Sequence, residues 1–244
     1  MTQGRYSRDI AVSAIRSFYQ FFATLPSLPP EYIWEPPAAG WPSINAHSLA
    51  PLRKNADVID LLRHIPYIDD TQIAFHTTVI DYTSDNIQWC FDKNVVQGNI
   101  VPFGAGEIPD YVAVLTDGSR YGSWLLLDTQ AGTITDFNAM GTPERDYPPR
   151  EHPDHWRAYR TLPIREFFES WKEEYRNLAW VVIPDDDDGV LCNLEPSTNE
   201  IRDLYRAHGW PFSFRREDCK EALLEWKKGW YEKLVADSAA RQHY

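Results

Sequence analysis

The chain is poor in cysteine and has no long apolar run, and each shortage excludes a class of protein. Its three cysteines, Cys90, Cys192 and Cys219, match neither a disulfide framework nor a zinc motif, so we expect reduced and mostly buried thiols. The longest apolar stretch, residues 178–183, is far below the roughly 20 residues that span a bilayer. Residues 10–25 read as an amphipathic helix rather than a signal-peptide core. We therefore expect a soluble, cytoplasmic protein.

Basic residues are also in short supply. The 24 basic and 36 acidic side chains give a net charge of −12, and no segment forms a basic stripe or tail. A protein that binds nucleic acid neutralises phosphates with Lys and Arg side chains, and a protein that binds an anionic membrane surface needs a similar cluster of basic residues. We therefore expect no nucleic-acid partner and no membrane partner. The length of 244 residues is enough to bury a core without disulfide or metal support.

Aromatic residues, in contrast, are abundant. The chain holds 10 Trp, 13 Tyr and 11 Phe, which make up 14% of its residues. Several of these rings fall in residues 25–51, which also carry seven prolines. A solvated linker rarely contains two tryptophans, so Tyr32, Trp34 and Trp41 indicate an extended segment that wraps the domain with its rings in the core.

Apolar residues at helical spacing predict five helices, at residues 7–24, 56–64, 163–178, 197–208 and 216–236. Ser7 is placed to cap the first helix, and Ser197 with Glu200 forms a capping box for the fourth. The last helix carries one apolar stripe that needs the sheet domain or a partner to cover it. Its members are Cys219, Leu223, Trp226, Trp230 and Leu234.

Alternating and β-branched residues predict the strands. Residues 73–82 alternate as one strand with His76 in its middle, and strands at 111–116, 123–128 and 133–137 form an antiparallel meander. The expected class is α+β, with a mostly antiparallel or mixed sheet of about four to six strands packed with helices. We expect one compact unit made of an N-terminal helix and wrap (1–55), a sheet and helix core (56–180) and a helical C-terminal extension (181–244).

The middle of the chain resembles the SUKH superfamily. The resemblance is carried by Asn99-Ile-Val-Pro-Phe-Gly104, Asp110-Tyr-Val-Ala-Val-Leu115, Gly122-Ser-Trp-Leu-Leu-Leu-Asp128, Gly132-Thr-Ile-Thr135 and Leu162-Pro-Ile-Arg-Glu-Phe-Phe168. It covers about residues 56–178 and implies an α+β fold with a protein-binding rather than catalytic role. The fungal branch of this family includes regulators of cell-wall synthesis, and the bacterial branch includes toxin-immunity proteins. An "I-P-F" strand start precedes the "D-Y/F" strand in the family.

Two features depart from this family pattern. The usual acidic "G-x-x-G/N-G" loop is replaced by Gly104-Ala-Gly-Glu-Ile-Pro109, and residues 180–244 have no counterpart in the minimal domain.

Familiar catalytic and metal motifs are missing or broken. There is no G-x-S-x-G elbow, and Pro109 spoils a phosphate loop at Gly104–Gly106 because proline has no N–H to donate. An acidic turn at 185–189 with Glu195 lacks a ligand at Pro184, so a solvated turn is favoured over weak divalent binding. The cluster at 151–155 is read as a polar loop in preference to a metal site. We expect no cofactor and no metal.

Two hypotheses remain. The first is a SUKH-like, fungal-type binding or regulatory module with a protein partner. The second is a cofactor-independent enzyme of secondary metabolism, a cyclase, pericyclase-like enzyme or isomerase, that holds an apolar small molecule in an aromatic-lined pocket. Its catalytic candidates are His76, Tyr82, Asp110 and Asp128. The candidate pocket rings are Trp34, Trp41, Trp89, Tyr111 and Trp124. The alternative reading of these rings is that they fill irregular gaps in a proline-rich protein.

Overall fold

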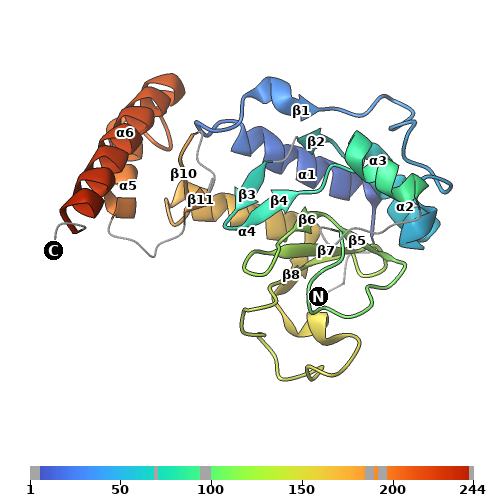
Figure 1. The fold of residues 1–244 in the computed structure, drawn as a ribbon. Coiled ribbons are helices and arrows are strands. Elements are labelled where there is room, and N and C mark those ends of the chain that lie inside the picture. Colours follow the sequence, from blue (N-terminus) through green and yellow to red (C-terminus); the bar gives the residue numbers. More distant parts are fainter. Residues whose placement is uncertain (1–5, 69–70, 94–99, 185–189, 192–196, 242–244) are drawn as a thin grey trace.

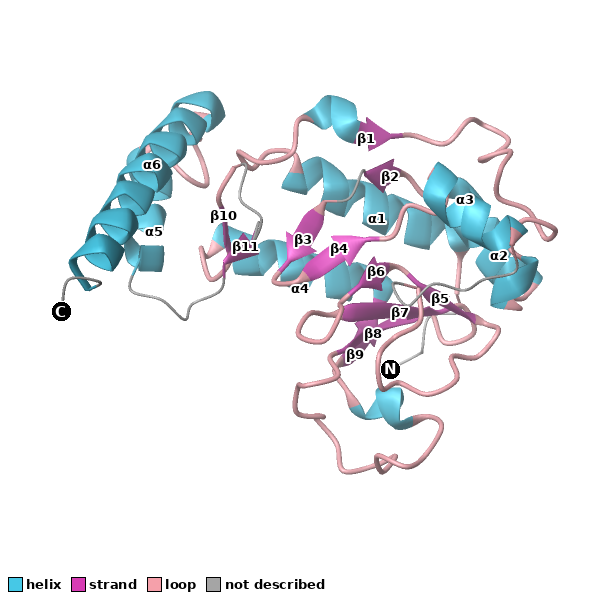
Figure 2. Cartoon of the chain, in the orientation of Figure 1, coloured by secondary structure: helices cyan, strands magenta, loops and turns pink. Residues whose placement is uncertain are grey.

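Helices and short antiparallel strands build the protein (Figures 1 and 2). The structure is a computed structural model that describes residues 6–68, 71–93, 100–184, 190–191 and 197–241. The helices are α1 (Arg8–Phe22), α2 (Ala56–His64), α3 (Asp85–Asp92), α4 (Ile164–Arg176), α5 (Ser197–Ala207) and α6 (Arg216–Arg241). The strands are β1 (Ile33–Trp34), β2 (Tyr67–Ile68), β3 (Gln72–Ala74), β4 (Thr77–Val79), β5 (Val112–Val114), β6 (Thr116–Asp117), β7 (Trp124–Asp128), β8 (Thr133–Phe137), β9 (Thr161–Pro163), β10 (Val181–Val182) and β11 (Val190–Leu191).

The strands form a four-stranded sheet in the order β5-β7-β8-β9 and a three-stranded sheet in the order β3-β4-β6. Two short ladders, β1-β2 and β10-β11, lie beside them, and each of these pairings is antiparallel. The α+β class is therefore confirmed, and so is the meander, as β5, β7 and β8.

One predicted strand serves both sheets. Residues 112–114 pair with β7, whereas residues 116–117 pair with β4. Thr116 stands at this change of partner, because its Oγ1 donates to the carbonyl oxygen of Ser123 at 2.7 Å and accepts from the N–H of Leu125 at 2.9 Å. The side chain thus replaces ladder hydrogen bonds where the strand crosses from one sheet to the other.

Helices α1 and α4 pack against each other beside the sheets (Figure 1). Their apolar faces meet at Phe18 and Phe168, whose ring centroids are 5.3 Å apart. Lys172 reinforces this contact: it is almost fully buried, and its Nζ donates to Ser17 Oγ at 2.8 Å and to Glu169 Oε1 at 2.7 Å. Segments 1–55 and 56–180 thus share one core.

The prediction of a single strand over residues 73–82 is wrong. The segment folds back as the β3–β4 hairpin, and His76 lies in its turn with a positive φ of 47°. The alternation that suggested one strand continues through the turn without a glycine or asparagine to mark it. Gly122 lets the turn pack closely, since a Cβ there would lie 1.9 Å from the carbonyl oxygen of His76. Helix α3, capped by Ser84, was not predicted.

The wrap is docked only in part. Trp41 is half-buried, and its Nε1 donates to the carbonyl oxygen of Ile65 at 2.9 Å. Tyr32 and Trp34, in contrast, are 49% and 38% exposed, so the prediction that these rings lie in the core is wrong for both. Arg16 holds the wrap from outside through two nitrogens on the Glu35 carboxylate. Because short strand pairing and this surface pair fix the segment, its rings need not enter the core.

Helices α5 and α6 form a pair at one end of the molecule, on the left in Figure 1. Trp210 attaches the pair to the end of α4 by donating from Nε1 to the carbonyl oxygen of Arg176 at 3.0 Å. Arg216 donates to the carbonyl oxygens of Leu25 and Leu28 at 2.9 and 3.0 Å. The predicted apolar stripe on α6 is covered only near its start: Cys219 and Leu223 are fully buried, whereas Trp230 is 37% exposed.

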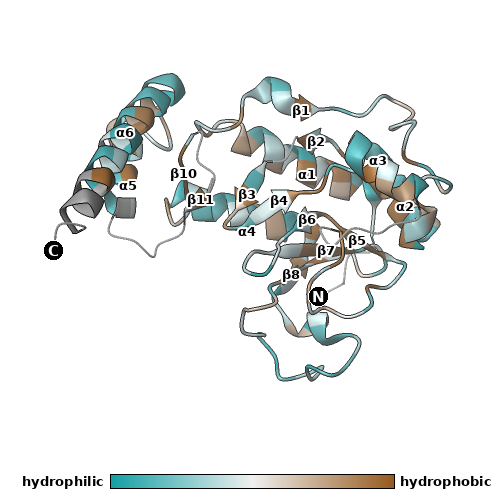
Figure 3. Ribbon diagram, viewed as in Figure 1, coloured by the Kyte–Doolittle hydropathy of each residue, from teal (hydrophilic) through white to brown (hydrophobic). Residues whose placement is uncertain are grey.

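Much of α6 is hydrophilic, as Figure 3 shows. The Leu234 and Ser197 side chains, Cys192 and the acidic turn at 185–189 with Glu195 lie outside the described residues. Glu200, the other half of the predicted capping box, accepts a hydrogen bond from Trp226 Nε1 at 2.6 Å. None of the helices in the described ranges combines the length and apolarity needed to cross a membrane.

Candidate functional site

The four catalytic candidates do not come together around His76. The His76 ring contacts Phe75 and Tyr121, with centroid distances of 4.2 and 6.0 Å. Tyr82 lies apart from His76, in the lining of the apolar cavity described below, where it is buried and donates its hydroxyl to the carbonyl oxygen of Val114 at 2.9 Å. Burial raises the pKa of the Tyr82 phenol above its usual range, so this group stays protonated. Asp110 is exposed, and its backbone carbonyl accepts from the N–H of Asn55 at 3.0 Å.

Asp128 has a structural environment at the end of β7. Its Oδ1 accepts from the backbone N–H groups of Gln130 and Ala131, both at 2.8 Å. Its Oδ2 accepts from Arg157 Nη1 at 3.0 Å. Arg157 in turn donates to the Tyr111 hydroxyl at 3.0 Å. All three hydrogen-bonded partners serve the turn and the loop behind it, so Asp128 closes a hairpin and anchors the loop at 155–158.

The candidate pocket rings are scattered. Trp124 is fully buried and donates to the carbonyl oxygen of Ser119 at 2.9 Å, while Trp89 is 62% exposed on α3. Trp34 and Trp41 belong to the wrap, and Tyr111 lies beneath Arg157. None of these five rings lines either of the two cavities described below.

Many of the remaining rings pack on one another instead. A continuous series of ring contacts, with centroid distances between 4.9 and 6.3 Å, runs from α1 through α4 to the α5–α6 pair. We call this series the aromatic chain. Its members are Phe18, Phe168, Trp171, Trp180, Tyr175, Phe21, Trp210, Phe214 and Tyr205. Most of these contacts are tilted or edge-on, and Tyr205 is stacked on Phe214. Rings packed in this way bury large apolar areas, so the aromatic chain stabilises the joint between the core and the C-terminal extension.

A better candidate site is an apolar cavity between α2, β5 and the loop at residues 100–109, which we call the α2–β5 pocket. Its volume is about 190 Å³. Helix α2 contributes Val58 and Leu62, and β5 contributes Ala113 and Val114. The loop supplies the outer wall, including Ile100, Val101 and Ile108. The loop also departs from the SUKH resemblance, because residues 100–103 form no strand start.

Lys54 is the cationic residue in the wall of this pocket. It lies directly before Asn55, which caps α2 by accepting from the N–H of Val58. Its Nζ donates to the carbonyl oxygens of Ile108 and Pro109, at 3.2 and 2.9 Å. Burial lowers the pKa of Lys54 to about 8, although nearby Asp110 and Glu107 act in the opposite direction. A concave apolar site with one perturbed titratable group is the usual form of a binding site.

The mouth of the pocket is apolar as well. Val101 lines the pocket and is 47% exposed. Two residues further along, Phe103 is 53% exposed, with the Arg120 guanidinium 5.4 Å above its ring. Phe103 also lines a second, more polar groove of about 490 Å³ that is formed by the loop at 139–151 with His155 and Tyr159. The exposed apolar surface thus joins two hollows.

The groove includes part of the 151–155 cluster that raised the question of a metal. His152 Nδ1 accepts from the N–H of Asp154 at 3.0 Å, and His155 Nδ1 meets the carbonyl oxygen of Pro148 at 2.9 Å. Because a carbonyl only accepts, His155 carries its proton on Nδ1. Within the described ranges, no group of three or more His, Cys, Asp or Glu residues has the arrangement of a metal site.

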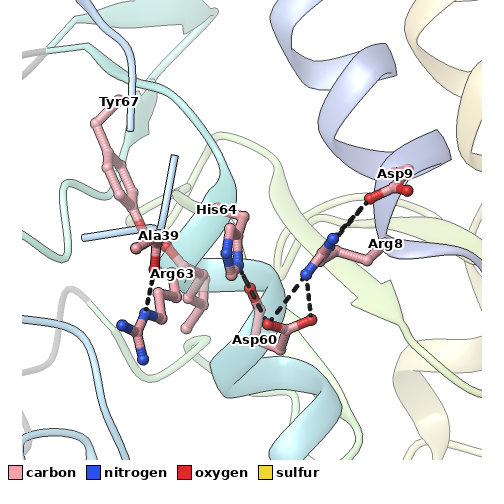
Figure 4. A network of polar contacts seen from close by, with 8 residues as sticks. Arg8, Asp9, Ala39, Asp60, Arg63, His64 and Tyr67 are labelled. Carbon is pink, nitrogen blue, oxygen red and sulfur yellow. Dashed lines mark hydrogen bonds and ion pairs between the residues drawn. The ribbon is translucent and has the colours of Figure 1, made fainter. Parts of the chain in front are cut away.

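A histidine–carboxylate pair that the sequence did not suggest lies on α2 (Figure 4). His64 Nδ1 is 3.2 Å from Asp60 Oδ1, and the same carboxylate accepts from Arg8 Nη1 at 3.1 Å. On the other side, a Cβ at Gly40 would lie 3.0 Å from His64 Nε2. The wrap therefore lies close to the second ring nitrogen of His64, whose side chain is 21% exposed. We read the network as a tie between α1, α2 and the wrap.

Sequence reasoning missed Lys54 and the pocket. The signal available was a run of apolar residues in a loop, Ile100 to Phe103, next to glycines. Comparisons with known proteins add no further assignment: no protein-family model, no curated protein and no solved structure matches the chain.

Proposed function

We propose that the chain is a binding module that holds one apolar side chain of a partner protein in the α2–β5 pocket. The observation that carries this proposal is the apolar cavity of about 190 Å³ opening beside exposed Val101 and Phe103. Small-molecule sites usually enclose roughly 300 Å³ or more. A smaller hollow with an apolar rim is typical of a hot spot, where one buried anchor is surrounded by contacts that exclude water.

The negative charge of the chain indicates which charged residues its partner should carry. Glu107 lines the pocket, Asp110 lies exposed nearby, and the whole chain carries a net charge of −12. A partner with Lys or Arg beside its apolar anchor would gain both faster association and the correct orientation from this field. The expected partner segment therefore combines an aliphatic or aromatic anchor with flanking basic residues.

Two further observations support a binding role. The resemblance to the SUKH superfamily implies protein binding, and a fungal regulatory module would fit it. The scatter of His76, Tyr82, Asp110 and Asp128 leaves no shared catalytic arrangement among them. Cys219 is a buried free thiol, which fits a reducing compartment, and we propose a cytoplasmic location.

A cofactor-independent enzyme of secondary metabolism is the second candidate. The observation that favours it is Lys54, since an amine with a pKa of about 8 in an apolar cavity can act as a base or a nucleophile. It has less support, because the cavity is small and the predicted aromatic rings lie elsewhere.

Selection from a random peptide library against the full chain tests the binding proposal. We expect the selected peptides to share an apolar anchor next to Lys or Arg. Val101→Glu should weaken their binding at least about tenfold, because it places a carboxylate at the apolar mouth. Val235→Glu is the matched control, since Val235 is 68% exposed on α6. Peptides without an apolar anchor, or equal losses in both variants, would reject the proposal.

A further inference from the structure

Lys54, which is half-buried, differs from the buried Lys172 in what its amine contacts. Lys172 Nζ pairs with the Glu169 carboxylate at 2.7 Å, which holds a cation in place. The Lys54 Nζ donates to two backbone carbonyls and lines an apolar cavity. A neutral amine has two hydrogens and one lone pair. Two carbonyls can therefore take both hydrogens of a neutral Lys54 amine and leave its lone pair on the opposite side of the nitrogen.

This setting favours the reactive form of the amine. With a pKa of about 8, roughly half of the Lys54 side chains are neutral at pH 8. An ordinary lysine, with a pKa near 10.4, is neutral in only about one molecule in 250 at that pH. The neutral fraction is therefore raised about 100-fold, and the apolar wall offers space of about 190 Å³ for the body of a reagent.

We propose that Lys54 is a covalent modification site that forms an imine with small apolar aldehydes held in the α2–β5 pocket. The Nζ lone pair attacks the carbonyl carbon, the C=O electron pair moves to oxygen, and a proton passes from nitrogen to that oxygen to give a carbinolamine. Loss of water then leaves a C=N bond between the aldehyde carbon and Nζ. No oxidant or reductant is needed for this step.

The modification has a structural consequence for the loop at 100–109. An imine nitrogen carries one hydrogen when protonated and none when neutral, so at least one of the two hydrogen bonds to Ile108 and Pro109 must break. Those bonds tie the loop that carries Val101 to the start of α2. Imine formation would thus both fill the pocket and loosen its outer wall. The inference uses the same cavity as the proposed function and does not depend on the protein partner.

The test uses the full chain, because its seven lysines serve as internal references. The protein is incubated with hexanal and sodium cyanoborohydride at pH 8, and the reduced adducts are located by peptide mass spectrometry. We expect Lys54 to be alkylated at least about tenfold faster than exposed Lys93, Lys228 and Lys233. Glyceraldehyde, which is polar, should show no preference for Lys54. The Lys54 rate should level off above pH 8, while the rates at exposed lysines should still rise.

Equal alkylation of Lys54 and the exposed lysines would overturn the proposal, and so would an equal preference for glyceraldehyde. Lys54→Arg is the control variant, because it keeps the cation and should lose only the hexanal-selective adduct. The outcome is distinct from that of the peptide selection. If the selected peptides bind but Lys54 is not modified, the imine is rejected and the binding module stands. If Lys54 is modified but no peptide with an apolar anchor is selected, the binding module is rejected and the imine site stands.

Discussion

Replacing Asp128 tests whether its carboxylate stabilises the fold, as its hydrogen bonds indicate, rather than taking part in catalysis. Asp128 is 2% exposed and accepts two backbone N–H bonds through Oδ1 and one Arg157 bond through Oδ2. Asp128→Asn keeps an oxygen for the two N–H groups and loses the ion pair. Breaking a fully buried pair costs about 3–5 kcal/mol, but the Arg157 side chain is 33% exposed and remains partly solvated. We expect a loss of about 2 kcal/mol in unfolding free energy.

Asp128→Ala removes the oxygen acceptors as well. The N–H of Ala131 is only partly accessible to water, so its loss of a partner adds about 1 kcal/mol, for a total of about 3 kcal/mol. Arg157→Met should lose less than Asp128→Ala, because it keeps an apolar stem over the Trp156 ring, where the guanidinium carbon now lies 4.1 Å from the ring centroid.

Urea unfolding followed by tryptophan fluorescence measures these differences, with the slope of the transition as a check on the two-state assumption. The double-mutant cycle of Asp128→Asn with Arg157→Met should give a coupling energy of about 1–2 kcal/mol. A coupling energy near zero, or an Asp128→Asn protein as stable as the wild type, would refute the reasoning. Peptide binding at the α2–β5 pocket should be unchanged in both Asp128 variants.

Three further perturbations have clear expected outcomes. Between pH 8 and 10.5 the unfolded state binds more protons at Lys54 than the folded state, so unfolding experiments should show wild type gaining stability over Lys54→Met as pH rises. Gly122→Ala should cost more than about 3 kcal/mol, because its Cβ would lie 1.9 Å from a backbone oxygen, whereas Gly229→Ala, with open space, should be neutral or stabilising in thermal unfolding. The hydrogen bond from Lys172 lowers the pKa of Glu169 in the folded state. In urea unfolding, wild type should therefore be more stable than Glu169→Gln above about pH 4.5, and this difference should disappear as the pH falls through the lowered pKa of Glu169.

The helices were predictable because local signals and packing agree in them. Residues 56–64 form α2 with the bounds that the sequence predicts, since Asn55 caps the start and Val58, Leu61 and Leu62 form one buried face. The hairpin at 72–79 was not predictable in the same way. Its turn uses His76 at positive φ, and this turn packs closely against Gly122, which lies 46 residues later in the chain. Tertiary contacts therefore determine the position of this turn, because the local alternation of residues does not mark it.

The candidate site was predictable only in its broadest outline. The sequence indicated a binding role and an aromatic excess, but Lys54 has no local motif to distinguish it from the exposed lysines. Its special character comes from burial against Ile108 and Pro109, which are more than 50 residues away in the chain. Asp128 shows the opposite case: a carboxylate at a strand end suggested chemistry, and the structure places it on two N–H groups and an arginine.

The rings of the aromatic chain serve packing rather than ligand binding. Rings on α1 and α4 meet those of the α5–α6 pair through contacts such as Phe21 with Trp210, at 6.3 Å, and Trp210 with Phe214, at 4.9 Å. A ring that already packs on other rings offers little surface to a ligand. The α2–β5 pocket, in contrast, is lined largely by aliphatic side chains and by the stem of Lys54. Aliphatic walls do not impose the stacking geometry of an aromatic cage, so they accept apolar groups of varied shape. The polar side chains in its lining are Lys54, Glu107 and Tyr82, and the Tyr82 hydroxyl already donates to the carbonyl oxygen of Val114, so specificity must come chiefly from Lys54 and Glu107.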